Sequence, residues 1–122
     1  MLPEEIIFSD DDSTDKTVEI IELWSQKNKS IKCKILKNQH GGPGNARNIG
    51  INNSSFQWIA FLDSDDTWDE NKILEVKKVI SRQLNINFIV HCSKYFLHSS
   101  TTLGSNVLSL NFLFRGLGCG IL

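Results

Sequence analysis

The sequence predicts an α/β fold, a mostly parallel sheet with helices on both faces. Short apolar runs typical of buried strands alternate with segments whose apolar residues recur at helical spacing. Turn-forming residues separate these segments. With 122 residues, of which 40% are apolar and 22% charged, the chain is typical of one ordinary globular domain. We therefore expect residues 1–122 to belong to a single domain.

A strand, a turn and a helix are expected first. Residues 5–9 form an apolar run suited to a buried strand, and residues 10–15 are rich in turn and helix-capping types. The helix is expected over residues 14–26, with Ser13 or Thr14 as its cap. Its apolar face contains Val18, Ile21 and Trp24.

The second unit is centred on a glycine-rich connection. Residues 31–36 are expected to form a strand, and residues 39–44 should break any helix or strand. A helix is expected over residues 45–51. Its first backbone amides would then be free to meet an anion.

Two further strands enclose the most regular helical pattern of the chain. Strands are expected over residues 57–62 and 86–91, and a helix over residues 69–84. After Tyr95 the pattern weakens. Strands that alternate with helices in this way favour parallel pairing.

Composition excludes several classes of partner. Thirteen basic residues against fourteen acidic ones give a net charge of −1, which provides no general attraction for nucleic acid. No apolar run approaches the roughly 20 residues of a membrane-spanning helix. The acidic N-terminus is unlike a signal peptide. Three cysteines without metal-type spacing argue against a disulfide framework and favour the cytoplasm.

An acidic cluster follows the third expected strand. Asp63, Asp65 and Asp66 place three carboxylates within four residues, and such groups repel one another unless a positive charge lies between them. Hard oxygen donors with few protein ligands suit Mg²⁺ or Mn²⁺ bound together with a substrate phosphate. A solvated acidic turn or helix start is the alternative that the cluster alone leaves open.

Three segments, each at an expected strand-to-helix junction, carry a family resemblance. They are Ile6 to Asp15 (IIFSDDDSTD), Gly41 to Gly50 (GGPGNARNIG) and Phe61 to Asp66 (FLDSDD). In this order they closely resemble the GT-A glycosyltransferases of the family 2 type, which transfer a sugar from a nucleotide-sugar donor. The resemblance covers residues 5 to about 95, and residues 111–122 more loosely.

The resemblance implies a role for each motif. Asp10 or Asp11 would accept a hydrogen bond from the base or the ribose, a role that suits an ionised carboxylate. Arg47 would contact the diphosphate, because a guanidinium can donate two parallel hydrogen bonds to phosphate. Asp63 and Ser64 would contact the nucleotide sugar. Asp65, together with Asp63, would bind Mn²⁺ or Mg²⁺.

Two departures from the family pattern point to an incomplete GT-A domain. Family members open with an apolar strand and a helix that precede the strand at residues 5–9, and that first strand lies in the middle of the sheet. We expect this first strand–helix unit and the acceptor-side half to be missing here. Rearrangement, a partner or a homodimer would then have to replace the strand. No downstream acidic motif matches the family's general base, so the catalytic base is unassigned.

The sequence therefore predicts a glycosyltransferase fragment that acts with a divalent metal. A complete relative would transfer the sugar to a hydroxyl of a saccharide or lipid-linked acceptor, in the cytoplasm or at the inner face of the membrane. A non-catalytic nucleotide-binding remnant or interaction module is the first alternative. A haloacid dehalogenase-like phosphatase, with Asp63 as nucleophile and Asp65 as acid/base, is the second. The sugar, the base, the acceptor and the stereochemical course stay open.

Overall fold

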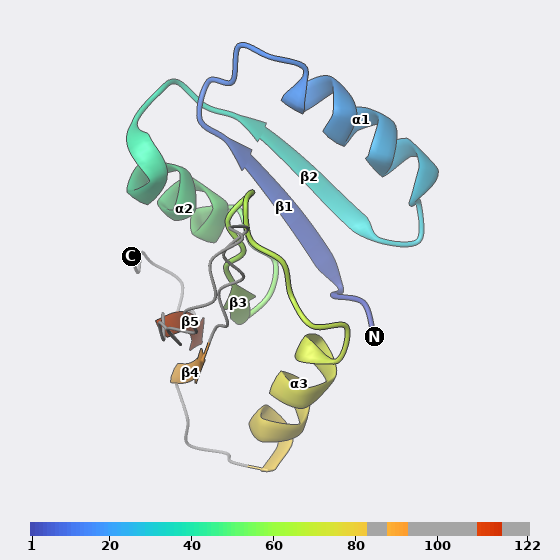
Figure 1. Ribbon diagram of the computed structural model, residues 1–122, viewed down its shortest axis with the longest axis vertical. Helices are drawn as coiled ribbons and strands as arrows, with labels where there is room; N and C mark the ends of the chain where they lie inside the picture. Colours follow the sequence, from blue (N-terminus) through green and yellow to red (C-terminus); the bar gives the residue numbers. More distant parts are fainter. Residues whose placement is uncertain (83–87, 93–109, 116–122) are drawn as a thin grey trace, which may run out of the picture.

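A computed structural model of the chain describes residues 1–82, 88–92 and 110–115. It confirms an α/β fold (Figure 1). No helix in these ranges is long and apolar enough to cross a bilayer. In chain order the elements are β1 (Glu5–Asp10), α1 (Thr17–Lys27), β2 (Lys32–Lys37), α2 (Gly42–Asn52), β3 (Trp58–Ala60), α3 (Lys72–Arg82), β4 (Phe88–Cys92) and β5 (Leu110–Arg115).

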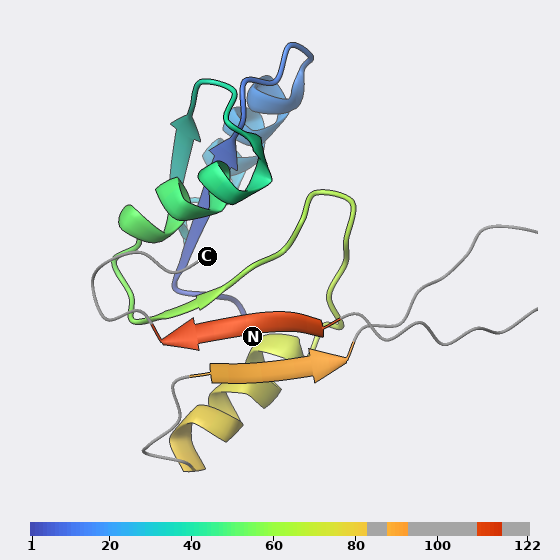
Figure 2. The same cartoon turned by 90° about the vertical axis from the view of Figure 1, so that its left-hand side faces the viewer.

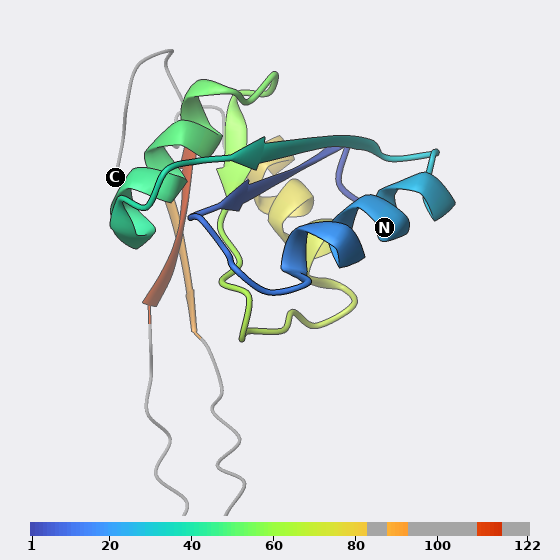
Figure 3. The ribbon, with the colours of Figure 1, turned by 90° about the horizontal axis from the view of Figure 1, so that it is seen from above.

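The first two strands form a parallel pair between two helices. Their register runs from Glu5 opposite Lys32 to Asp10 opposite Lys37, which places opposite charges side by side at both ends. Helices α1 and α2 lie on opposite sides of this pair (Figures 2 and 3). Because both strands end at the same edge, the loops that follow them meet there.

The other three strands form a second sheet. Its order is β3-β5-β4, and β5 runs antiparallel to both neighbours. Helix α3 lies beside this sheet (Figure 2). We expected one mostly parallel sheet. The described strands form a parallel pair, β1 and β2, as expected, and in addition an antiparallel sheet around β5, a strand that the sequence pattern did not predict.

Two helix starts differ from expectation. Helix α2 begins at Gly42, inside the segment expected to break helices, because a proline in the first helical turn needs no intrahelical N–H bond. Helix α1 begins at Thr17, and no side chain caps it at its N-cap residue, Lys16. Ser13 and Thr14 therefore lie too far upstream to cap it. The Asp15 carboxylate instead accepts from the Thr17 N–H at 2.9 Å.

Little apolar surface is fully enclosed in the described part of the chain. Ile31 and Ala46 are its only buried hydrophobic residues. Trp24 packs edge-on against Phe8, with ring centroids 5.7 Å apart and planes at 74°, so this tryptophan connects α1 to β1 as a packing residue.

One buried carboxylate connects three segments. The Glu5 side chain is only 3% exposed and lies 3.0 Å from Lys32 Nζ and 3.2 Å from Lys34 Nζ. It also accepts from the backbone N–H and the hydroxyl of Ser55. Burial raises the pKa of Glu5, but the Ser55 N–H and the two lysines more than offset it and lower the pKa to about 2. Glu5 thus ties β1 and β2 to the turn that leads into β3.

Candidate functional site

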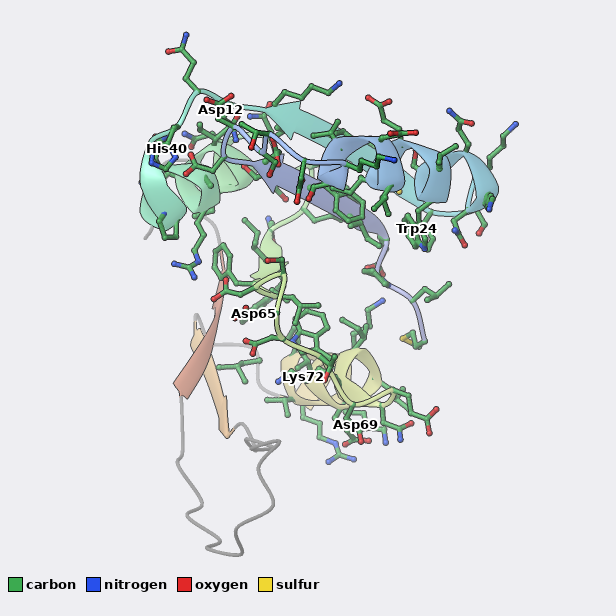
Figure 4. The ribbon with its side chains drawn as sticks, turned by 45° about the horizontal axis from the view of Figure 1, so that its top comes forward. Asp12, Trp24, His40, Asp65, Asp69 and Lys72 are labelled. Atoms are coloured by element: carbon green, nitrogen blue, oxygen red, sulfur yellow. The ribbon has the colours of Figure 1, made fainter. Side chains whose placement is uncertain are left out.

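Hydrogen bonds bring the three sequence motifs together around α2. Asp11 follows β1 and contacts the N-terminus of α2, while Asp63 follows β3 and contacts Arg47 within α2. Figure 4 shows Asp12 and His40 close together at the end of the β1–β2 pair, and Asp65 on the loop after β3. Helix α2 is therefore the element that the two acidic motifs share.

Asp10 is buried and partly satisfied by its own turn. Asp10 is only 9% exposed. Its Oδ2 accepts a hydrogen bond from the Ser13 N–H at 3.0 Å. Its backbone oxygen accepts from the Asn38 N–H at 3.0 Å. No described residue donates to Oδ1. This oxygen is the one left for another donor.

The Asp11 side chain binds the backbone at the start of α2. Its Oδ1 accepts from the Gly41 N–H at 2.8 Å and its Oδ2 from the Gly42 N–H at 2.9 Å. His40 Nδ1 lies 3.0 Å from Oδ2. The Gly41 N–H in particular lowers the pKa of Asp11, with Gly42 and His40 adding to the effect. A carboxylate of the chain itself therefore binds the amides of Gly41 and Gly42 at the start of α2. The free amides were expected on a helix beginning at residue 45, so these two were not among them.

Asp12 adopts the backbone conformation that glycine favours. Its φ is 68°, in the left-handed region. A residue with a Cβ is strained there by roughly 1–2 kcal/mol.

Ser9 and Asn38 hold α2 against β1, and sequence reasoning did not select either. The Ser9 hydroxyl donates to the Ala46 carbonyl at 2.6 Å and accepts from the Asn38 side-chain amide at 2.9 Å. The strand register is the feature that explains their proximity. Because Asp10 lies opposite Lys37, the residues that follow β1 and β2 lie next to one another. That register fixes the position of α2 and with it Arg47.

Arg47 pairs with Asp63. Arg47 Nη2 donates to Oδ1 at 2.7 Å and to Oδ2 at 2.9 Å. The Arg47 side chain is 39% exposed and that of Asp63 is 53% exposed. Two residues assigned from separate motifs, 16 positions apart, therefore lie in direct contact.

The turn after β3 presents the remaining acidic residues. The Asp66 N–H donates to the Asp63 carbonyl at 3.0 Å, so residues 63–66 form one turn, and Ser64 and Asp65 are exposed on it. Among the described residues no group of three or more histidine, cysteine or acidic side chains could hold a metal. Two carboxylates, Asp63 and Asp65, nevertheless fit Mg²⁺ or Mn²⁺, which keep waters or substrate phosphates as their other ligands.

We expect Gly42→Ala to destabilise the start of α2 by about 1–2 kcal/mol. Gly42 has φ +81°, and a Cβ built there meets no atom within 4 Å, so the loss is one of backbone strain alone. Gly44→Ala is the matched control: its Cβ also meets nothing within 4 Å, but its φ is not in the positive range. Because Gly44 lies inside the helix, alanine there should stabilise by about 0.5–1 kcal/mol.

Urea unfolding of the two variants measures both effects. Opposite shifts of the midpoint are expected, downward for Gly42→Ala and upward for Gly44→Ala. Equal shifts of the same sign would contradict this account of the loop.

Comparisons with known proteins decide the family. The family model for glycosyl transferase family 2 matches residues 2–112. The chain belongs to this family. The resemblance read from the three motifs and the GT-A fold class are thereby confirmed, and the phosphatase alternative is set aside.

Several relatives are similar over much of the chain. An uncharacterized glycosyltransferase of Rickettsia bellii is 38% identical over 96 residues, 79% of this chain and 12% of the relative. A UDP-Glc:alpha-D-GlcNAc-diphosphoundecaprenol beta-1,3-glucosyltransferase, WfgD of Escherichia coli, is 32% identical over 97% of this chain and 46% of its own length. A poly(ribitol-phosphate) beta-N-acetylglucosaminyltransferase, TarS of Staphylococcus aureus, is 37% identical over 51% of this chain and 11% of its own length. The chain thus spans less than half the length of each of these relatives.

Proposed function

We propose that this chain forms the donor-binding part of a glycosyltransferase, and that it binds a nucleoside diphosphate sugar together with a divalent metal. The observation that carries the proposal is the Arg47–Asp63 contact. Arg47, which we propose binds the diphosphate, lies beside the turn of residues 63–66, which we propose binds the metal. Family membership supports the same assignment.

Each site residue has a proposed role that suits its surroundings. Asp10 Oδ1 would accept from the base or the ribose, since no described residue donates to it. Each carboxylate oxygen of Asp11 already accepts a hydrogen bond from the Gly41 or the Gly42 amide. Asp11 would therefore accept from the nucleotide only through the remaining lone pairs of these oxygens. Arg47 would bind the diphosphate. Asp63 and Ser64 would border the nucleotide sugar.

Asp63 and Asp65 would hold Mn²⁺ or Mg²⁺. A bound cation of this kind stabilises negative charge on a departing nucleoside diphosphate. The chain's own residues then contribute position: Ser9 and Asn38 fix α2 on β1, and α2 carries Arg47 to the acidic turn. The general base is left unassigned.

The donor proposed is a UDP-sugar, and the acceptor a hydroxyl of a saccharide or a lipid-linked saccharide. The relative WfgD supports this donor, because its name describes glucosyl transfer from UDP-Glc to a diphosphoundecaprenol-linked sugar. A cytoplasmic location at the inner face of the membrane fits such an acceptor. A partial domain, completed by further chain, by a partner or in a homodimer, also stays a proposal.

A non-catalytic nucleotide-binding module is the second candidate. The described strands form two separate sheets, and the roles proposed for the residues brought together are binding roles, since the general base is unassigned. Release of UDP from a UDP-sugar by the purified chain would favour the enzyme, whereas binding without any turnover would favour the module.

Calorimetric titration with UDP, GDP and ADP, each with Mn²⁺, tests the proposed function. We expect UDP to bind and Arg47→Gln to weaken its binding by about tenfold or more, because a charge-assisted hydrogen bond contributes about 1.5–3 kcal/mol. Lys27→Gln, at the far end of α1, removes the same charge and should leave binding nearly unchanged. Equal losses in both variants would contradict the assignment of Arg47.

A further inference from the structure

The Arg47–Asp63 pair joins two motifs that would act on the same ligand. Arg47 lies within α2, and Asp63 lies in the turn after β3. A single nitrogen of Arg47, Nη2, contacts both carboxylate oxygens, at 2.7 and 2.9 Å. The carboxylate therefore occupies the position that two oxygens of a phosphate group could take.

The pair is open to water. Its side chains are 39% and 53% exposed, and ion pairs with this exposure stabilise a protein by only about 0–1 kcal/mol. A diphosphate as a whole carries more charge than one carboxylate, and its oxygens can accept two parallel hydrogen bonds from a guanidinium. Exchange of one anion for the other on Arg47 is therefore energetically easy.

Asp11 shows a different use of a carboxylate in the same region. Its two oxygens accept from backbone amides of Gly41 and Gly42, which cannot turn away from it. Asp63 is instead held by a side chain that can rotate. Of the two carboxylates that contact α2, Asp63 is the one that a ligand can displace.

Building on the proposed function, we propose that Asp63 is an internal substitute for the donor's phosphate on Arg47. Binding of the diphosphate and release of Asp63 are then one exchange. Once released from Arg47, the Asp63 carboxylate would be free to hold a divalent cation, and the metal and the nucleotide would then bind with positive coupling. Asp63 acts here as a positioning residue that holds Arg47 until the donor arrives.

Calorimetric titration without metal, in EDTA, tests this exchange. The probes are UDP and inorganic pyrophosphate, which contains the diphosphate without the base. Asp63→Asn should tighten binding of both by about 3- to 5-fold, because the ligand no longer has to displace a charged competitor. Asp66→Asn removes the same charge from the same turn without an Arg47 contact, and should change affinity by less than about 2-fold at physiological salt. Asp63→Ala is a second variant, and circular dichroism checks that each one folds.

The double variant Arg47→Gln/Asp63→Asn distinguishes displacement of Asp63 from Arg47 from a non-specific effect of removing one negative charge. If Asp63 acts through Arg47, its replacement gives no tightening once Arg47 is absent. With Mn²⁺ added, UDP affinity should rise more in the unmodified protein than in Asp63→Asn.

Three results would overturn the inference. Metal-free affinity that is unchanged or lower in Asp63→Asn would show that Asp63 does not compete with the diphosphate. Equal tightening with and without Arg47 would show a general charge effect. Binding of neither probe by any variant, with or without Mn²⁺, would overturn the proposed function and the inference with it, whereas the first two results leave the proposed function standing.

Discussion

Replacement of Glu5 by glutamine is expected to lower the free energy of unfolding by about 2–3 kcal/mol at neutral pH. The Glu5 side chain is 3% exposed and lies against Lys32 and Lys34. Glutamine keeps the size but removes the charge that these two lysines and the Ser55 N–H stabilise. Thermal or urea unfolding measures the loss.

Glu4→Gln is the matched control. Glu4 pairs with Lys77, but its side chain is 54% exposed, so its replacement should change the free energy of unfolding by no more than about 1 kcal/mol. A loss in Glu5→Gln that is no larger than in Glu4→Gln would contradict the role assigned to Glu5.

The pH dependence follows from the same carboxylate. The pKa of Glu5 falls from 4.5 to about 2 on folding. A group with a lowered folded pKa stabilises the protein above its unfolded pKa, and that contribution is lost as the pH falls through the folded value. The stability difference between the unmodified protein and Glu5→Gln should therefore shrink as the pH is lowered from about 4.5 toward 2.

Asp65→Ala is expected to abolish the metal-dependent part of nucleotide binding, a loss of about tenfold or more. Asp65 is exposed on the turn of residues 63–66, where its carboxylate is open to a cation. Asp66→Ala removes the neighbouring carboxylate and should keep the metal dependence. Undiminished metal dependence in Asp65→Ala would contradict the proposed metal site.

Much of the fold could be predicted, because the spacing of apolar residues within a short segment indicates whether that segment buries one face as a strand or as a helix. The strand at residues 5–9 became β1 with one added residue, and the helix expected at residues 69–84 corresponds to α3, which begins at Lys72. Residues 83 and 84 lie outside the described ranges. Helix α2 began early because the proline in its first turn is tolerated there. Strand β5 was missed because its support comes from pairing with β3 and β4, which are distant in sequence.

The candidate site was predictable as residue types but not as contacts. Arg47 and Asp63 were selected for separate roles, and their pairing depends on where α2 packs. The Asp11 contacts with Gly41 and Gly42 depend on the register of β1 and β2. Ser9 and Asn38 gave no signal of their own, because their importance lies in a hydrogen bond across 29 positions.

The central claim is that this chain contains a metal-dependent donor site, and thermal unfolding of the purified chain tests it most directly. Mn²⁺ and UDP are added alone and together, with Asp65→Ala measured in parallel. The account predicts a shift that needs both ligands, about 2.7 kcal/mol at 100 times the dissociation constant, and that is absent in Asp65→Ala. A cooperative transition that no nucleoside diphosphate moves, with or without Mn²⁺, would contradict it.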